Sequence, residues 1–360
     1  MKTIKLFDPH TNADEEKATI RVLKSHFWAS GAGVENVEKF EGSFKKYINC
    51  DECVAVNSGS AALHLALSLF DLKGKEVILP SMTFVSTAHA VIMNGGKPVF
   101  AEVDEKTLCI DSHKLEEKIT KNTSIILPVH FGGMSCDLKN IQKISKKNNL
   151  ELVEDAAHAA GTTYDKNKIG IHGKAVCFSF HPVKNLAMPT GGLIAINSKN
   201  SKILKKILNS KRWCGITNRK NMQYDVNQIG WNYYMNEFSA AIGLAQLKKL
   251  NKMISKRKKI AKIYVDEIKI ENKMPFSNDC SYHLYWIRVK NRNKFIKDMQ
   301  REKIETGIHY KPVHLMSYYK NKNKLSLTEK IGEEVISIPI HQNLSEIEIQ
   351  RIIKNVNKFS

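Results

Sequence analysis

Long apolar runs, internal repeats and a secretory signal are all missing from this chain of 360 residues. No segment approaches the roughly 18 consecutive apolar residues that a membrane-spanning helix needs. The first residues, MKTIKLFDPHTNADEEK, contain no apolar signal core. Because 42% of the residues are hydrophobic and 26% are charged, a disordered chain is excluded. We therefore expect a globular, cytoplasmic protein with no membrane partner.

The cysteines lack the spacing of a metal site. There are seven, an odd number in a chain without a secretory signal, so free thiols are expected. Cys50 and Cys53 form a single CxxC pair, but a zinc site needs two more ligands at a compatible spacing, and the next cysteine is Cys109. We therefore predict no metal and interpret these cysteines as buried or incidental, with a redox role as the alternative.

Acidic residues are scarce beside basic ones. The chain holds 36 Asp and Glu against 56 Lys and Arg, a net charge of +20. This excess is compatible with nucleic acid, an anionic membrane, a phosphate-rich small substrate, or a lysine-rich composition without functional meaning. It is concentrated after residue 245, where 25 basic residues stand against 12 acidic ones, and no helix-turn-helix, zinc-finger or RNA-recognition motif accompanies it. We expect no nucleic-acid partner and keep nucleic-acid binding as an alternative hypothesis.

Apolar runs and amphipathic helices alternate over the first two thirds of the chain, which predicts an α/β domain with a mostly parallel central sheet flanked by helices. Strands are predicted at 76–80, 97–104, 124–131, 150–157, 175–182 and 192–197, and helices at 60–72, 86–95, 112–119 and 137–149. From residue 236 a long helix, or two joined ones, leads into a different pattern. We predict a large α/β domain over 1–245 and a small C-terminal α+β domain over 246–360.

The segment VAVNSGSAALHLAL, residues 54–67, joins a predicted strand to a predicted helix through small residues. Small residues let backbone N–H groups approach an anion, and the N-terminus of the helix adds the positive end of its dipole. This pattern is typical of a phosphate site, although a plain strand–turn–helix with Ser58 or Ser60 as N-cap explains it as well. It matches neither the Walker A motif nor GxGxxG, so it does not indicate ATP or a dinucleotide.

Two further segments place a charged residue beside an apolar strand. In LVEDAAHAAGTTY, residues 152–164, Asp155 could hold a cationic ring nitrogen, bind a metal or cap the next helix. In CFSFHPVKNLAMPTGGLIAIN, residues 177–197, Lys184 is the single lysine. Such a lysine is either a solvated loop residue or, with a lowered pKa, a nucleophile that forms a Schiff base.

A phosphate site, a carboxylate and an isolated lysine in this order match the needs of pyridoxal 5'-phosphate. At these residues the sequence resembles the DegT-like sugar-nucleotide aminotransferases, which have the aspartate-aminotransferase fold, fold type I of the pyridoxal-phosphate-dependent transferases. The resemblance covers nearly the whole chain. It is carried by VNSGSAALHLAL, EDAAHAAG, SFHPVKN, PSMTFVSTAHAVIMNGGKPVFAEVD (80–104), GWNYYMNEFSAAIGLAQL (230–247) and GIHYKPVH (307–314).

The resemblance implies a role for each matching residue. Lys184 would be the catalytic residue, forming the Schiff base with the cofactor and moving the proton, and Asp155 would pair with the ring nitrogen. His158 would lie near the phenolic oxygen of the cofactor, and Phe84 would stack on its ring. The cofactor phosphate would be bound by Ser60, Ala61 and Ser179, and by Asn232 of a neighbouring subunit, since family members are homodimers with shared active sites.

The resemblance also implies a reaction. An amino group would pass from L-glutamate to a keto sugar linked to a nucleoside diphosphate, in the biosynthesis of amino sugars or surface polysaccharides. A dehydratase subgroup has lost the lysine, so Lys184 favours transamination; a dehydratase-like or a non-catalytic regulatory relative is the alternative. Two departures from the family pattern remove charge: Tyr234 stands in place of an arginine, and Thr190 in place of an acidic residue.

Three more residues are candidates for contact with the substrate. The segment 195–224 holds eight basic residues and no acidic one, which fits either a solvated helix or a site for the diphosphate that includes Arg212. His309 and Tyr310 either line the sugar pocket or pack in a turn.

Overall fold

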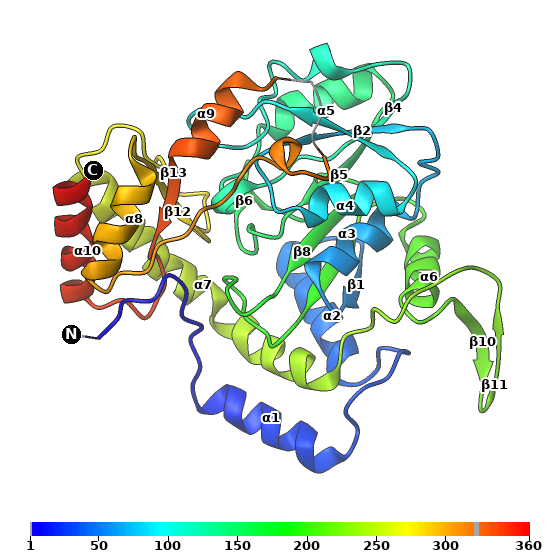
Figure 1. The fold of residues 1–360 in the computed structure, drawn as a ribbon. Helices are drawn as coiled ribbons and strands as arrows, with labels where there is room; N and C mark the ends of the chain where they lie inside the picture. The colour runs from blue at the N-terminus through cyan, green and yellow to red at the C-terminus, as the bar shows by residue number, and fades with distance from the viewer. Residues whose placement is uncertain (1, 320–323) are drawn as a thin grey trace.

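The computed structural model describes residues 2–319 and 324–360. Its centre is a seven-stranded sheet in the order β1-β9-β8-β5-β4-β2-β3, with helices on both faces (Figure 1). The strands are β1 Glu52–Val56, β2 Glu76–Pro80, β3 Lys97–Ala101, β4 Thr123–Ile126, β5 Glu151–Asp155, β8 Ala175–Ser179 and β9 Gly192–Ile196. The neighbours from β3 to β8 are parallel, and β9 is antiparallel to both of its neighbours. The predicted α/β fold with a mostly parallel sheet is confirmed.

Both faces of this sheet are buried, because successive side chains of a strand alternate between two apolar cores. In β2, Ile78 belongs to one core, while Val77 and Leu79 belong to the other. The first core is completed by α2 Asn36–Ile48, α5 Leu138–Lys147 and α7 Glu237–Glu267, and the second by α3 Gly59–Leu67 and α4 Ser86–Met93. The sheet is therefore a layer held from both sides, and the ends of its strands can position side chains.

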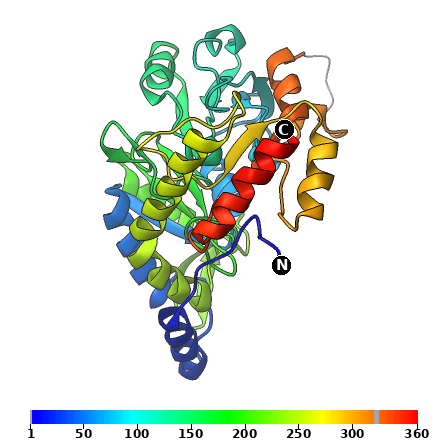
Figure 2. The ribbon, with the colours of Figure 1, turned by 90° about the vertical axis from the view of Figure 1, so that its left-hand side faces the viewer.

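The C-terminal part is built on a two-stranded antiparallel sheet. Its strands are β12 Tyr285–Arg288 and β13 Val335–Ile338, and its helices are α8 Arg292–Arg301, α9 Ser326–Glu334 and α10 Glu346–Phe359. The N-terminal segment lies against this part, since Ile4 pairs with Ile304 and the Lys2 carbonyl accepts a hydrogen bond from Arg351 (Figure 2). Residues from both ends of the chain thus build the smaller part.

Helix α7 connects the two parts, as does the N-terminal segment that leads from the smaller part to α1 Ala13–Ser25. The Asn236 side chain caps the N-terminus of α7 by accepting a hydrogen bond from the Ser239 N–H at 2.8 Å. The helix then continues for 31 residues, so of the two forms expected from the sequence the single long helix is observed. The predicted division between residues 245 and 246 falls inside this helix, and the chain passes from one part to the other without a linker.

The remaining elements lie outside the central sheet. Helix α1 Ala13–Ser25 packs on α7, and α6 Ser201–Lys211 leads into the hairpin of β10 Ile216–Lys220 and β11 Gln223–Val226, which projects from the body in Figure 1. A second, short hairpin is formed by β6 Thr163–Tyr164 and β7 Asn167–Lys168. Within the described ranges, no helix has the length and apolar character needed to cross a bilayer.

One predicted helix does not form. Residues 112–119 contain only the 3-10 turn Glu116–Lys118. The polar groups of Ser112 bond outside a helix instead: its hydroxyl donates to Asp137 at 3.0 Å, and its carbonyl accepts from the Asn140 side chain at 3.3 Å. These tertiary hydrogen bonds compete with helix formation at this position.

Candidate active site

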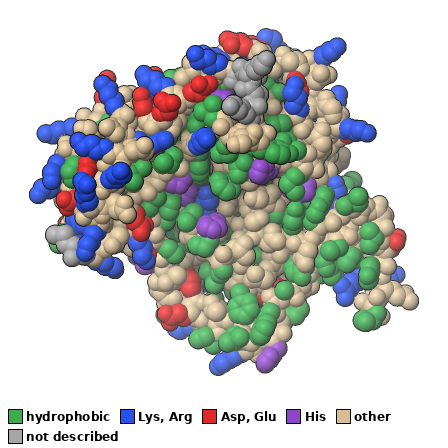
Figure 3. Space-filling view, in the orientation of Figure 1, with side chains coloured by type: hydrophobic (Ala, Val, Ile, Leu, Met, Phe, Trp, Pro, Cys, Tyr) green, Lys and Arg blue, Asp and Glu red, His purple; other side chains and the backbone are tan. Residues whose placement is uncertain are grey.

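A pocket opens where strands β5 and β8 end and helix α3 begins, with a volume of about 360 Å³. In the space-filling view, histidine side chains gather around a hollow near the centre of this face, with hydrophobic side chains beside it (Figure 3). Eight of the residues predicted for the site line the pocket together: Ser60, Phe84, Asp155, His158, Ser179, Lys184, His309 and Tyr310.

Asp155 is the last residue of β5 and is buried at the floor of the pocket. Its carboxylate accepts hydrogen bonds from the Thr87 hydroxyl at 2.8 Å and from the Ala157 N–H at 3.0 Å. Burial raises the pKa of Asp155, against the lowering effect of these donors and of Lys184. The preceding residue, Glu154, points to the opposite face of the sheet, where it contacts the His130 ring at 2.8 Å. Strand alternation therefore separates a pocket carboxylate from a core carboxylate.

Lys184 follows β8 in a tight turn, in which its N–H donates to the His181 carbonyl at 2.8 Å. Its side chain reaches the pocket, and its Nζ lies 3.4 Å from Nε2 of His283. Burial lowers the pKa of Lys184 to about 8, although the Asp155 carboxylate acts in the opposite direction. The amine is therefore far more available as a nucleophile or base near neutral pH than an ordinary lysine.

The predicted phosphate site lies at the N-terminus of α3. Gly59 begins the helix and Ser179 ends β8; a Cβ on Gly59 would stand only 2.7 Å from the Ser179 Cβ. Glycine at this position thus allows the helix N-terminus and the strand end to form one wall of the pocket. Such a helix N-terminus favours an anion.

The structure shows the N-cap that the sequence offered as the alternative interpretation of this segment. The Ser58 hydroxyl is the N-cap of α3 and accepts a hydrogen bond from the Ala61 N–H at 3.1 Å. Ala61 lines a shallower hollow beside the main pocket, together with Ser60. Ser60 is therefore the better placed of the two residues for an anion in the pocket.

His158, His309 and Tyr310 form one side of the pocket. The Gly132 N–H donates to Nδ1 of His158 at 3.2 Å, so Nε2 carries the hydrogen and lies 3.1 Å from the Tyr310 hydroxyl. Burial and the nearby Lys184 charge lower the pKa of His158 well below its ordinary value, and the same two causes lower the pKa of His309 to about 4. This side is therefore uncharged at neutral pH. His309 and Tyr310 line the pocket and also pack beside it, since the His309 ring contacts Phe7 and the Tyr310 ring contacts Phe131, so both interpretations describe part of what is observed.

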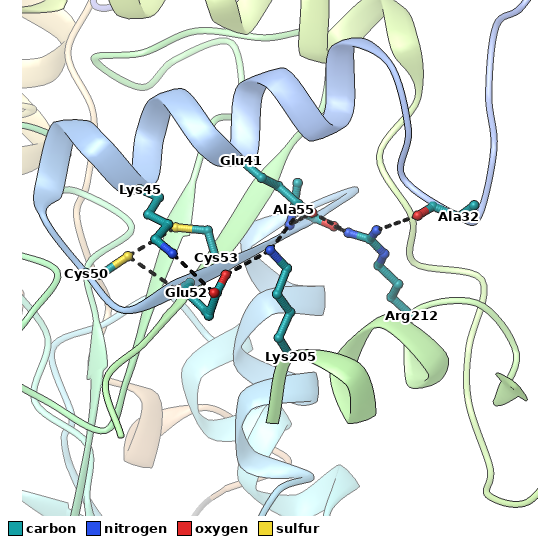
Figure 4. A network of polar contacts seen from close by, with 9 residues as sticks. All are labelled: Ala32, Glu41, Lys45, Cys50, Glu52, Cys53, Ala55, Lys205 and Arg212. Carbon is teal, nitrogen blue, oxygen red and sulfur yellow. Dashed lines mark hydrogen bonds and ion pairs between the residues drawn. The ribbon is translucent and has the colours of Figure 1, made fainter. Parts of the chain in front are cut away.

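Arg212 lies elsewhere, and its expected contact with the substrate is not what the structure shows. Its side chain is buried, and Nη1 donates to Glu41 at 2.6 Å and to the Ala55 carbonyl at 2.8 Å, while Nη2 contacts the Ala32 carbonyl at 3.3 Å (Figure 4). The basic side chain is thus engaged in joining α2, β1 and the loop before α2. It has no free face toward the pocket.

The CxxC pair lies beside this cluster. The Sγ atoms of Cys50 and Cys53 are 3.3 Å apart, and both thiols are free and buried (Figure 4). Of the other cysteines, only Cys214 is exposed. In the part of the chain that the structure describes, no group of three or more His, Cys, Asp and Glu side chains could hold a metal ion.

Asn232 and Thr190 each form a hydrogen bond with Asn57, which precedes α3. The Asn232 carbonyl accepts a hydrogen bond from the Asn57 side chain at 3.3 Å, and Asn232 itself is exposed outside the pocket. The Thr190 hydroxyl donates to the Asn57 carbonyl. An ionised acidic side chain, which the resemblance predicts at this position, has no proton to donate, so this contact gives a physical reason for the threonine.

Sequence reasoning missed three residues at the site. Phe7 lines the pocket from the N-terminal segment, Thr87 bonds to Asp155, and His283 bonds to Lys184. A histidine inside the apolar run HLYWIRV was the one available signal for His283. Nothing local distinguishes Phe7 or Thr87, because their partners are distant in the sequence.

Comparison with known proteins gives a consistent result over the whole chain. Residues 9–357 match the model of the DegT/DnrJ/EryC1/StrS aminotransferase family. The spore coat polysaccharide biosynthesis protein SpsC of Bacillus subtilis is 33% identical, covering 97% of this chain and 95% of SpsC. The GDP-perosamine synthase of Escherichia coli O157:H7 is 31% identical, covering 100% and 99% of the two chains.

Solved structures show the same likeness. Helicobacter pylori PseC, an aminotransferase involved in the biosynthesis of pseudoaminic acid, superposes with a TM-score of 0.93 at 27% identity and covers 99% of both chains. The sugar aminotransferase Spr1654 of Streptococcus pneumoniae, in its PLP form, also has a TM-score of 0.93, at 26% identity over 99% of this chain and 98% of Spr1654.

Proposed function

The chain belongs to the DegT/DnrJ/EryC1/StrS aminotransferase family, and from this premise we propose its amino donor and acceptor. It is a pyridoxal-phosphate-dependent sugar aminotransferase with the fold of that family. We propose that it moves the amino group of L-glutamate to the keto carbon of a sugar linked to a nucleoside diphosphate, for amino sugars or surface polysaccharides. The observation that carries this proposal is the pairing, in one pocket, of the Lys184 amine at a lowered pKa with the buried Asp155 carboxylate.

The pocket residues fit pyridoxal phosphate on two grounds. Asp155 accepts hydrogen bonds from two neutral donors, the Thr87 hydroxyl and the Ala157 N–H, and forms no ion pair within the described residues. A protonated pyridine nitrogen would therefore complete its set of partners. The close approach of Gly59 to Ser179 leaves a wall without side-chain bulk at the N-terminus of α3. Ser60, Ser179 and this helix N-terminus would hold the phosphate.

The reaction divides between the cofactor and the chain. When bound, pyridoxal phosphate supplies an electron sink for the electron pair left by a broken C–H bond beside the amino nitrogen. Lys184 would hold the cofactor through Nζ and, once displaced by the substrate amine, would take the proton from that carbon and return it. Asp155 would keep the ring nitrogen protonated, while the bonded pair of His158 and Tyr310 would orient the ring from one side.

The sugar would bind on the outer side of the pocket. Phe84, with 56% of its surface exposed, forms part of the rim near Tyr310, and their ring centroids are 6.1 Å apart. His309, uncharged because of its lowered pKa, can donate or accept a hydrogen bond without selecting for charge. A rim of aromatic rings and neutral polar groups suits a sugar, whose hydroxyl groups are uncharged donors and acceptors.

We further propose that the protein works as a cytoplasmic homodimer with shared active sites. The face around the pocket carries many hydrophobic side chains, and the β10–β11 hairpin projects beyond it (Figures 1 and 3). Met222 on the hairpin is 88% exposed, and Asn232 is exposed outside its own pocket. A partner subunit covering this face would bury the apolar side chains and receive Asn232 at its phosphate site. Sedimentation of the wild type and of Met222→Asp tests the dimer.

Spectroscopy and mass spectrometry test the reaction. Protein loaded with pyridoxal phosphate should absorb visible light, and L-glutamate should bleach this band and yield 2-oxoglutarate. A panel of nucleotide-linked keto sugars should then reveal the acceptor by the mass of its amino product, with the corresponding reduced sugars as controls. The function is wrong if the protein cannot bind the cofactor, and the proposed donor is wrong if other amino acids bleach the band but L-glutamate does not.

A further inference from the structure

His283 is a buried side chain at the site for which the mechanism above gives no role. It is 2% exposed, and its Nε2 lies 3.4 Å from Nζ of Lys184. Its ring stacks on Phe7, with centroids 5.6 Å apart and planes 17° from parallel, and lies 4.4 Å from the ring of His158. The imidazole is therefore clamped between two rings with one edge against the lysine.

The protonation state of His283 follows from its surroundings. Burial lowers the pKa of His283 well below its ordinary value, and the charges of Lys184 and Arg257 act in the same direction. A neutral imidazole has one accepting nitrogen, whereas the Lys184 ammonium has no lone pair and therefore only donates. Nε2 must then accept and Nδ1 must carry the hydrogen. Nδ1 is buried and finds no partner anywhere in the described residues, so the bond to Lys184 is the one polar contact that this ring makes there.

The segment that carries His283 is attached to the lysine turn at a second point. The side chain of Asn185, the residue after Lys184, donates to the Ser281 carbonyl at 2.9 Å. On the other side of the segment, Arg257 of α7 donates to the Tyr282 carbonyl at 3.1 Å. Two consecutive residues of the turn thus contact residues 281–283, and α7 holds that segment in place. This framework fixes the backbone that carries His283 relative to the Lys184 turn and so keeps Nε2 within reach of Nζ.

We propose that His283 is a positioning residue for the Lys184 amine. Its Nε2 accepts a hydrogen bond from Nζ whenever Nζ is free of the cofactor, and so keeps the amine at the pocket wall until it carries the proton. A neutral acceptor suits this task, because a carboxylate would trap the amine as an ammonium. The inference rests on the proposed function in so far as Lys184 is the proton carrier.

Several ionisable groups face the Lys184–His283 pair from the elements packed around it. They are Asp155, His158, His181, Arg257, His309 and Tyr310. A test must therefore change the acceptor on His283 and leave these charges in place, which neutral replacements of His283 do.

Two variants separate the hydrogen bond from ring packing. His283→Phe keeps a ring against Phe7 and removes the acceptor, whereas His283→Gln places an amide oxygen within reach of Nζ. In protein freed of cofactor, acetic anhydride labelling of the Lys184 peptide as a function of pH gives the pKa of the amine, with Lys168 as an internal reference. Because the lost bond stabilises the ammonium, we expect the Lys184 pKa in His283→Phe to fall about one unit below its value of about 8. His283→Gln should return the Lys184 pKa most of the way to its wild-type value.

The holoenzyme gives a second readout. We expect kcat of His283→Phe to fall about tenfold, with little change in KM for L-glutamate, and His283→Gln to recover most of the rate. The matched control is His172→Gln, which removes a half-buried histidine that packs against the Tyr164 ring and does not line the pocket, and should leave kcat and the Lys184 pKa unchanged.

The outcomes are distinguishable. If the Lys184 pKa and kcat are the same in every His283 variant, His283 only packs and the inference is wrong. If Lys184→Ala retains full activity, the proposed function itself fails, whatever the His283 variants do. If circular dichroism shows that His283→Phe is unfolded, His283→Asn replaces it, because the shorter side chain does not reach Nζ. The inference then requires the Lys184 pKa to fall in His283→Asn and to stay near the wild-type value in His283→Gln.

Discussion

Two groups of charged side chains in this molecule differ in whether the chain itself provides their ion-pair partners: Arg212 with Glu41, and Lys184 with Asp155. Arg212 and Glu41 meet at 2.6 Å, and the arginine also binds two backbone carbonyls (Figure 4). At the pocket, by contrast, burial pushes both Lys184 and Asp155 toward their neutral forms, lowering the pKa of the first and raising that of the second. Charge that stabilises the fold is paired within the chain. The charged groups of the pocket, Lys184 and Asp155, would instead be paired by the ligand that binds there.

The two groups look alike in the sequence. Arg212 and Lys184 are both basic residues close to apolar segments, and both were candidates for the site. The structure shows that the difference lies in their partners: Glu41 is 171 residues from Arg212 along the chain. Substitutions that remove one charge at a time should separate the two groups, because one set should reduce activity and the other stability.

Lys184→Ala should have the largest effect on activity. We expect kcat to fall by at least about a thousandfold, because both the attachment of the cofactor and the proton carrier are lost. Borohydride treatment of the loaded variant should no longer add the mass of the cofactor to the protein. The matched control is Lys168→Ala, which removes another lysine whose pKa burial lowers, outside the pocket and above the Tyr47 ring. An active Lys184→Ala would place the chemistry elsewhere.

Arg212→Ala should have the opposite profile. Removing Arg212 takes away the closest cationic partner of buried Glu41 and leaves it with Lys205, 3.9 Å away, so we expect the free energy of unfolding to fall by about 3 kcal/mol. The activity of the protein that remains folded should stay within about twofold of the wild type, since Arg212 does not line the pocket. Urea titration and the rate per bound cofactor measure the two quantities. A stable variant with a raised KM for the nucleotide sugar would restore the role first expected from the sequence.

The sequence could predict what depends on neighbouring residues and not what depends on distant contacts. The strands around the pocket and the motifs of Ser60, Asp155 and Lys184 are local patterns of apolar, small and charged residues. The structure brings them together because parallel strands end at one edge of the sheet. The partners of Arg212 and Lys184 were not predictable, because Glu41 and His283 lie 171 and 99 residues away from them. The pairing of Ser112 with Asp137 is a similar case, and it replaces a predicted helix.

Adjacent carboxylates on β5 allow the same comparison within one strand. Asp155→Asn keeps the shape of the side chain and removes the charge that would hold the ring nitrogen protonated, so we expect kcat to fall about a hundredfold with little loss of stability. Glu154→Gln faces the core and the His130 ring, so it should lower the free energy of unfolding and leave kcat nearly unchanged. If both variants lose activity to the same extent, the assignment of the two faces is wrong.

The lowered pKa of Lys184 makes the stability of the cofactor-free protein depend on pH. Its value of about 8 in the folded protein lies below the 10.5 of an unperturbed lysine, so the unfolded chain binds more protons between these two values. The stability of the cofactor-free protein should therefore rise with pH from about 8 to 10.5. Below 8 the destabilisation caused by this group should be constant, so it adds no pH dependence there. Thermal unfolding of the wild type and of Lys184→Met across this range measures it: the extra slope should vanish in the variant. A slope that persists would belong to other groups.

The smallest effect concerns Thr190, where the sequence departs from the family. Its hydroxyl donates to the Asn57 carbonyl, just before the helix that would hold the phosphate. Thr190→Val removes one hydrogen bond and should lower the free energy of unfolding by about 1 kcal/mol, with cofactor affinity reduced by no more than about threefold. Thr190→Asp places a carboxylate, which can only accept, against the Asn57 carbonyl, so it should be the more destabilising of the two variants. The destabilisation should become smaller as the pH falls and the carboxyl group is protonated. A more stable Thr190→Asp would mean that an acidic side chain finds a donor at this position and that the threonine is exchangeable with it.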